Sequence, residues 1–143
     1  MDTYTIDTEL EHYYGDRMAT SSREACRRFY VRSVSRFNGS DLERYFANVR
    51  AHAQAYSSLN HMFRSPFTHA ETPLLLSSLV LLVSSIVMVA SGETSALIAG
   101  GTSAGLLGAL QCGRKLLKYW QEHAVREAVF QEFAEFLLEE TGR

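Results

Sequence analysis

The chain has 143 residues, a net charge of −2 and an isoelectric point near 6.2, which suits one domain and gives no reason to expect a nucleic-acid partner. Its two cysteines are too few for a disulfide framework. The charges are segregated, because residues 65–113 hold two glutamates and no lysine or arginine. We therefore expect the polar flanks and the apolar middle to occupy different environments.

Residues 1–20 form an acidic N-terminal segment with five acidic residues and one arginine. The segment has neither the basic start nor the apolar core of a secretory signal. An internal apolar segment is therefore expected to direct the chain to any membrane it reaches.

Residues 21–65 are predicted to form a pair of cytoplasmic helices. Each begins at a capping-box pattern, Ser21-x-x-Glu24 for a helix to about Phe37 and Ser40-x-x-Glu43 for a helix to about residue 64. The first helix is rich in arginine. Three interpretations of its basic face remain open: pairing with acidic residues of the last helix or of residues 1–16, contact with anionic lipid headgroups, or simple solvation.

Residues 73–113 are predicted to form a transmembrane helical hairpin, with helices 73–91 and 95–113 and a polar turn at 92–94. Each apolar stretch has the roughly 20 residues that cross about 30 Å of hydrocarbon. So short a turn makes the two helices antiparallel neighbours. The alternative is a hairpin buried inside a soluble helical protein and able to insert later.

Small residues recur along both predicted spans at the spacing of packed helices, which favours close backbone contact. The predicted helix-packing residues are Ser77, Ser78, Ser84, Ser85, Gly101, Gly105 and Gly108. A second stripe formed by Gly100, Ala104 and Gly108 suggests that two copies of the chain pack together as a homo-oligomer.

Basic and aromatic residues follow the second span, whereas the turn carries no lysine or arginine. The predicted membrane-interface residues are Arg114, Lys115, Lys118 and Trp120. By the positive-inside rule, both termini face the cytoplasm. Cys112 lies at the same end, where it is a candidate for lipidation, although a packing role is the simpler interpretation.

Residues 114–141 are predicted to form a C-terminal amphipathic helix. Together with the helical pair it would make a small cytoplasmic bundle, so the expected fold is all-α: a two-helix transmembrane hairpin with flanking amphipathic helices. The apolar faces of 41–63 or 116–137 are candidate surfaces for a protein partner.

The sequence contains no catalytic, cofactor-binding or metal-binding pattern, so we expect a protein that is not an enzyme. The five histidines form no i, i+4 pair. No charge lies inside either span, which argues against a selective transporter.

We therefore expect an integral membrane protein with the lipid bilayer as a partner, serving as an anchored interaction or scaffold protein. The alternative is a pore-forming or membrane-perturbing effector. In general plan, although in no residue motif, the chain resembles phage holins and bacterial two-transmembrane defence effectors.

Overall fold

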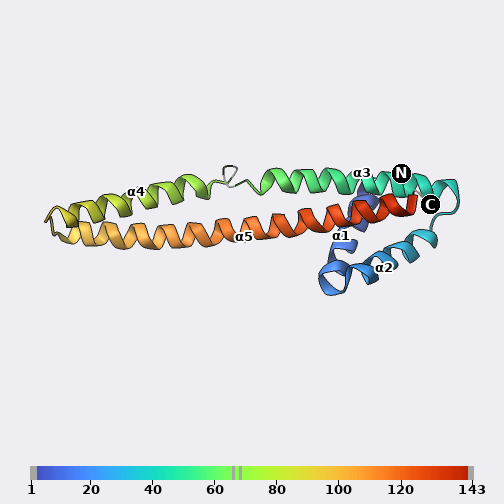
Figure 1. The fold of residues 1–143 in the computed structure, drawn as a ribbon, viewed down its shortest axis with the longest axis horizontal. Coiled ribbons are helices and arrows are strands. Elements are labelled where there is room, and N and C mark those ends of the chain that lie inside the picture. The colour runs from blue at the N-terminus through green and yellow to red at the C-terminus, as the bar shows by residue number, and fades with distance from the viewer. Residues whose placement is uncertain (1–2, 66, 68, 142–143) are drawn as a thin grey trace. The chain divides into compact units, whose positions relative to one another are not determined.

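The computed structural model describes residues 3–65, 67 and 69–141, which are helical throughout most of their length (Figure 1). The helices are α1 (Thr3–Ala19), α2 (Ser22–Val34), α3 (Ser40–Phe63), α4 (Glu71–Ala90) and α5 (Ala96–Thr141), and the described residues contain no strand. The predicted all-α class is thus confirmed. The chain divides into two compact units: a first unit, Met1–Met62 with His123–Arg143, and a second unit, Phe63–Glu122. Helix α5 contributes to both.

The acidic N-terminal segment forms helix α1, an element that the sequence analysis did not assign. Ile6, Leu10 and Tyr13 are buried at the spacing of one helical face, with Glu9 buried beside them. Packing of this face stabilises α1 despite its many acidic residues. Residues 1 and 2 of the segment lie outside the described residues.

Helices α2 and α3 begin at the two predicted capping boxes. The Ser21 hydroxyl accepts a hydrogen bond from the Glu24 backbone N–H at 3.4 Å, and α3 starts at Ser40. Helix α2 ends at Val34, three residues before the predicted end at Phe37. Gly39 has a φ of +54°, a left-handed conformation that glycine adopts without strain, and it turns the chain into α3.

An aromatic core joins α1, α2, α3 and residues 123–141 of α5 in the first unit. Phe29 lies at its centre, edge-on to Phe133 with ring centroids 4.8 Å apart, and Tyr13 stacks on Phe133 at 3.8 Å. Such pairs add to the hydrophobic gain of burial. The buried apolar residues are Ile6, Leu10, Tyr13, Ala25, Cys26, Phe29, Tyr45, Phe46, Val49, Ala53, Val129, Phe130, Phe133, Ala134 and Leu137.

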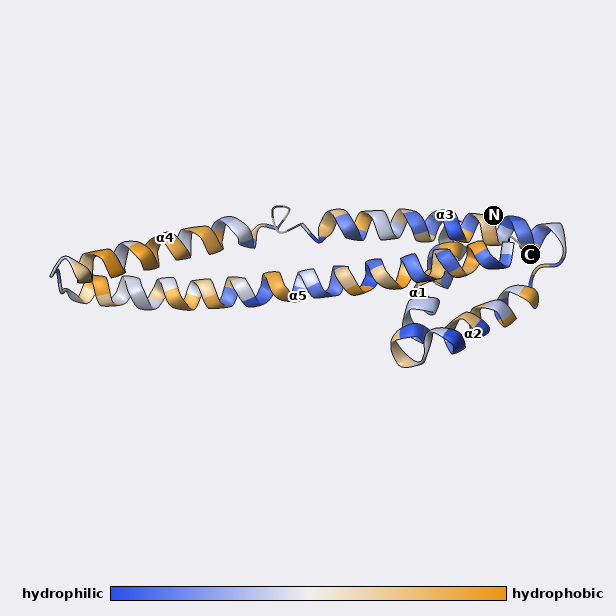
Figure 2. Cartoon of the chain, in the orientation of Figure 1, coloured by the Kyte–Doolittle hydropathy of each residue, from blue (hydrophilic) through white to orange (hydrophobic). Residues whose placement is uncertain are grey.

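The second unit is an antiparallel hairpin of α4 and residues 96–122 of α5 (Figure 1). Helix α4 is apolar along most of its length (Figure 2). It ends in a Schellman motif: the Gly92 N–H bonds to the Val89 carbonyl, the Glu93 N–H bonds to the Met88 carbonyl, and Gly92 has a φ of +89°. The Ser95 hydroxyl then accepts a bond from the Ile98 N–H at 3.4 Å, and α5 begins.

Candidate functional site

The two helices of the hairpin meet along a seam of small residues. Gly105 is buried, and a Cβ atom there would lie 2.9 Å from both the Leu82 backbone nitrogen and the Ser78 carbonyl oxygen. A Cβ at Gly101 would lie 2.9 Å from the Ser85 hydroxyl, and Gly108 faces the Ser78 side chain. We call Ser78, Ser85, Gly101, Gly105 and Gly108 the glycine–serine seam. The helices approach this closely because α5 has glycine, and so no side chain, at three positions that face α4.

The four predicted packing serines divide into two groups. Ser78 and Ser85 lie in the seam, and the Ser85 hydroxyl donates to the Leu81 carbonyl of its own helix at 2.9 Å. Ser77 and Ser84 are exposed, and Ser77 donates to the Pro73 carbonyl at 2.8 Å. The structure therefore brings one serine of each predicted pair to the glycines. The backbone of Leu82 also lies against Gly105. Because leucine is not a small residue, the spacing of small residues did not predict this contact.

The outer surface of the hairpin is apolar and uncovered. Helices α4 and α5 each contain a stretch long and apolar enough to cross a membrane, and only 6% of the most apolar 18 residues of each is buried. The large apolar side chains exposed on these two helices between residues 74 and 110 are Leu74, Leu76, Leu79, Val80, Leu81, Val83, Ile86, Val87, Met88, Val89, Leu97, Leu106, Leu107 and Leu110. Apolar patches of this extent mark surfaces that bind a protein or a membrane.

The predicted interface residues lie in α5 at the end of the hairpin opposite its turn. Arg114, Lys115 and Lys118 are exposed, and about half of Trp120 is exposed. The Lys118 ammonium lies 3.9 Å from the Glu122 carboxylate, one helical turn further on. Long basic side chains and an amphipathic indole at one end of an apolar helix suit a boundary between hydrocarbon and water.

A groove of about 520 Å³ opens at this basic end, within the second unit. Leu75 of α4 and Leu116, Leu117 and Trp120 of α5 supply its apolar lining, with Arg64 and His69 from the link before α4. Two contacts hold the His69 side chain in place. Its Nε2 donates a hydrogen bond to the Phe63 carbonyl at 2.9 Å, and its ring stacks on the Tyr119 ring with centroids 5.0 Å apart. Arg64 and His69 thereby form one side of the groove. No periodic pattern in the sequence predicts this groove.

The two cysteines occupy different environments. Cys112, the candidate lipidation residue, is partly buried. Cys26 is buried in the first unit, with its sulfur 3.4 Å from the Tyr13 hydroxyl. Burial raises the pKa of the Cys26 thiol, which disfavours the reactive thiolate despite the arginines that follow it.

The arginine-rich face of α2 pairs mainly with α1. Arg32 lies 3.2 Å from Glu9 and 2.9 Å from Asp16, and Arg36 lies 2.7 Å from Glu9, whose side chain is 4% exposed. Arg28 also pairs with Asp16, at 3.2 Å. Among the three interpretations of this face, the structure favours pairing with the N-terminal acidic residues.

The acidic side of α5 contributes one further cluster. Glu132 accepts hydrogen bonds from Arg17 at 3.3 Å and from the Ser22 hydroxyl. This carboxylate therefore connects the end of α1 and the start of α2 to α5.

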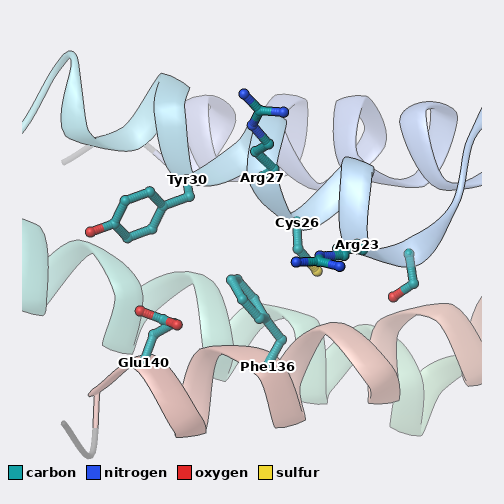
Figure 3. Close-up of a pocket in the computed structure, with 7 residues that line it drawn as sticks. Arg23, Cys26, Arg27, Tyr30, Phe136 and Glu140 are labelled. Carbon is teal, nitrogen blue, oxygen red and sulfur yellow. The ribbon is translucent and has the colours of Figure 1, made fainter.

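A cavity of about 600 Å³ lies between α2 and the end of α5 (Figure 3). Phe136 faces Cys26, Tyr30 and Glu140 line one end of the cavity, and the Arg27 guanidinium points away from it (Figure 3). The lining combines the Tyr30 and Phe136 rings with arginine and glutamate side chains, and the Ser22 hydroxyl at its edge donates to the Glu132 carboxylate.

The described residues contain no group of three or more histidine, cysteine, aspartate or glutamate side chains placed to hold a metal ion. Comparison of the chain with protein-family models, with curated proteins and with solved structures finds no match. The hairpin, its glycine–serine seam and its basic end are therefore the features from which function is inferred.

Proposed function

We propose that the chain is a non-enzymatic, membrane-anchored helical interaction protein, in which the α4–α5 hairpin crosses the bilayer twice. One observation carries this proposal: the hairpin leaves its leucine, valine and isoleucine side chains uncovered, while the first unit uses its own apolar residues in an aromatic core. Burying each such side chain in hydrocarbon gains about 1.5–3 kcal/mol over leaving it in water. A bilayer supplies that burial along the whole hairpin.

The serine side chains of the hairpin are also compatible with a hydrocarbon environment. The exposed hydroxyls of Ser77, Ser91 and Ser103 each donate to a carbonyl of their own helix, at 2.8, 3.0 and 2.9 Å. Since unpaired polar groups are costly in a bilayer, these internal bonds make the serines compatible with the span. The glycine–serine seam holds the two helices together where lipid gives no hydrophobic drive for association.

Orientation follows from charge in this proposal. The end of the hairpin that is continuous with the first unit has four basic residues: Arg64, Arg114, Lys115 and Lys118. The only charged residue of the turn at 92–94 is Glu93. The positive-inside rule then places both termini and the first unit in the cytoplasm. There the first unit is free to bind a protein partner, through the outer surface of α3 or of α5, while a second copy packs on the outer small residues of the hairpin.

The proposal is tested by alkaline carbonate extraction of membranes, followed by protease protection of a chain tagged at both termini. We expect the chain in the pellet and both tags accessible from the cytoplasmic side. A matched pair sharpens the result: Val83→Arg should release the chain, since an arginine in mid-span costs about 2.5–3.5 kcal/mol, whereas Val83→Leu should not. Wild-type chain in the supernatant would instead indicate a soluble protein with an insertable hairpin.

A pore-forming effector would also remain in the pellet, so a second measurement separates it from an anchor. The chain is reconstituted in vesicles loaded with a self-quenching dye. An anchor leaves the dye enclosed, because the polar hydroxyls and glycines of the seam are used within the hairpin. Dye release that grows steeply with the protein-to-lipid ratio would favour the effector.

A further inference from the structure

The basic end of the hairpin carries a preformed groove that the anchoring role alone does not require. Its apolar wall comes from Leu116, Leu117 and Trp120, which share one face of α5 through i, i+1 and i+4 spacing, and from Leu75 of α4. Its polar lining comes from Arg64 and His69. A volume of about 520 Å³ falls within the range of ordinary small-molecule sites.

We propose that this groove binds one anionic phospholipid, with an acyl chain against the leucines and the phosphate against Arg64. The inference rests on the proposed membrane hairpin, because that hairpin would bring the groove to the level of the headgroups. Guanidinium groups bind phosphate through two parallel hydrogen bonds, which a lysine cannot reproduce. The indole N–H of Trp120 adds a further donor at the same level.

Charge favours an anionic lipid over a zwitterionic one. This end of the unit has four basic residues, Arg64, Arg114, Lys115 and Lys118, against two acidic ones, Glu71 and Glu122. Arg114 and Lys118 each follow a groove-lining residue of α5 directly, so their charges flank the site. The local excess of positive charge attracts a headgroup that carries net negative charge.

Continuity with the apolar surface favours a lipid over a peptide. Leu117 is 62% exposed, and the exposed leucines at 106, 107 and 110 continue the apolar surface toward the turn. An acyl chain that leaves the groove can therefore follow these leucines along α5 toward the turn. Contacts with Phe63 and Tyr119 hold His69 at the edge of the groove.

Trp120 makes the proposal directly measurable, because it is the single tryptophan of the chain and lines the groove. The full chain is reconstituted in phosphatidylcholine vesicles containing small amounts of phosphatidylglycerol brominated on its acyl chains, or of equally brominated phosphatidylcholine. Bromine quenches an indole only at close range. We expect brominated phosphatidylglycerol to reach half-maximal quenching at about one fifth of the mole fraction that brominated phosphatidylcholine needs.

Three arginine variants distinguish a lipid site in the groove from general attraction to surface charge. Arg64→Gln should abolish the preference for phosphatidylglycerol, and Arg64→Lys should retain only part of it. Arg114→Gln, which removes the same charge beside the groove, should keep most of the preference. Equal losses in Arg64→Gln and Arg114→Gln would overturn the groove in favour of diffuse attraction.

Quenching of the wild-type chain also tests the lipid site without any variant, so the test does not depend on whether a variant inserts into the membrane. Equal quenching by the two brominated lipids would overturn the lipid site while leaving the membrane hairpin intact. Quenching by neither lipid would place Trp120 away from the acyl chains and overturn the lipid site, while carbonate extraction tests the membrane hairpin independently.

Discussion

At Gly105 the backbones of α4 and α5 are in contact, which makes this position sensitive to a single methyl group. A Cβ would lie 2.9 Å from backbone atoms of Leu82 and Ser78, and backbone atoms cannot rotate away. We expect Gly105→Ala to destabilise the hairpin by about 1–3 kcal/mol through overpacking. Titration of the micellar protein with dodecyl sulfate, read by Trp120 fluorescence, measures this change.

Gly100 is the matched control, because a Cβ there meets nothing within 4 Å. In micelles that hold one chain each, Gly100→Ala should leave the stability of the hairpin unchanged or raise it by up to about 1 kcal/mol, since alanine is the better helix former. Gly108→Ala should fall between the two, because the Ser78 hydroxyl that faces it can rotate. Identical effects at Gly100 and Gly105 would contradict the seam.

Glu9 is the most buried charged side chain described in the first unit, and two arginines hold it. Replacing it by glutamine removes the charge that bonds Arg32 at 3.2 Å and Arg36 at 2.7 Å. We expect Glu9→Gln to lower the free energy of unfolding by about 1.5–3 kcal/mol, the range for charge-assisted hydrogen bonds. Urea titration of the micellar protein, followed by tyrosine absorbance, measures the loss.

Glu11 provides the comparison, because its side chain is 57% exposed and pairs with Arg126 at 3.3 Å. An exposed pair contributes about 0–1 kcal/mol, so Glu11→Gln should have a much smaller effect than Glu9→Gln. Equal destabilisation by the two variants would show that burial of Glu9 does not govern the strength of its ion pairs.

Asp16 makes the stability of the first unit depend on pH. Burial acts to raise the pKa of this carboxyl, but hydrogen bonds from Arg32 and Arg28 outweigh it and hold the pKa below the ordinary value of 3.8. A carboxyl with a depressed folded-state pKa stabilises the protein above its unfolded-state pKa and loses this contribution as the pH falls through the folded-state pKa. The stability difference between wild type and Asp16→Asn should therefore be constant from about pH 7 to about pH 5 and narrow toward about pH 3. A difference that persists unchanged to about pH 3 would contradict this account.

At the scale of elements, the Tyr13–Phe133 stack is the closest of the ring contacts that attach α1 to α5. The Tyr13 and Phe133 rings stack at 3.8 Å, and both side chains are fully buried. We expect Phe133→Ala to cost about 3–5 kcal/mol, because a cavity would open in the centre of the core. Phe136→Ala, at a partly buried position that lines the cavity beside Cys26, should cost clearly less. Circular dichroism during urea titration compares the two variants.

The helices that were predicted from sequence carry strong local signals, and the helix that was missed does not. The Ser21 cap and the turn at Gly92 mark the start of α2 and the end of α4, and the second capping-box pattern coincides with the start of α3 at Ser40. The acidic residues of α1 obscure the short apolar spacing of Ile6, Leu10 and Tyr13. Its stability depends on partners far away in sequence, Phe133 and Arg32 among them, which a local pattern cannot reveal.

The candidate site shows the same division between local and long-range information. Regular spacing predicted the seam glycines, but choosing Ser78 and Ser85 over Ser77 and Ser84 requires the rotation of α4 against α5, which follows only from packing. The groove depends on His69 reaching back to Phe63 and Tyr119. Neither contact belongs to a periodic pattern, so the sequence could predict a basic end but not a cavity there.

For the whole molecule, the two units are expected to unfold separately. Each has its own kind of core: aromatic rings and ion pairs in the first unit, and a glycine–serine seam with an apolar exterior in the second. Helix α5 passes through both, yet most of the stability of a helix comes from tertiary packing rather than from the continuity of its backbone. Urea should therefore unfold the first unit in water while micelle-embedded helices resist it.

The positions of the chromophores allow this to be measured in one sample. Six of the seven tyrosines belong to the first unit, and the single tryptophan belongs to the second. In a urea titration of the micellar protein, we expect tyrosine absorbance to change in one transition while Trp120 emission stays near its folded value. Phe133→Ala should shift only the tyrosine transition, and Gly105→Ala should change only the response of Trp120 to dodecyl sulfate. Coincident transitions for both probes, shifted together by either variant, would mean that α5 couples the units into one cooperative structure.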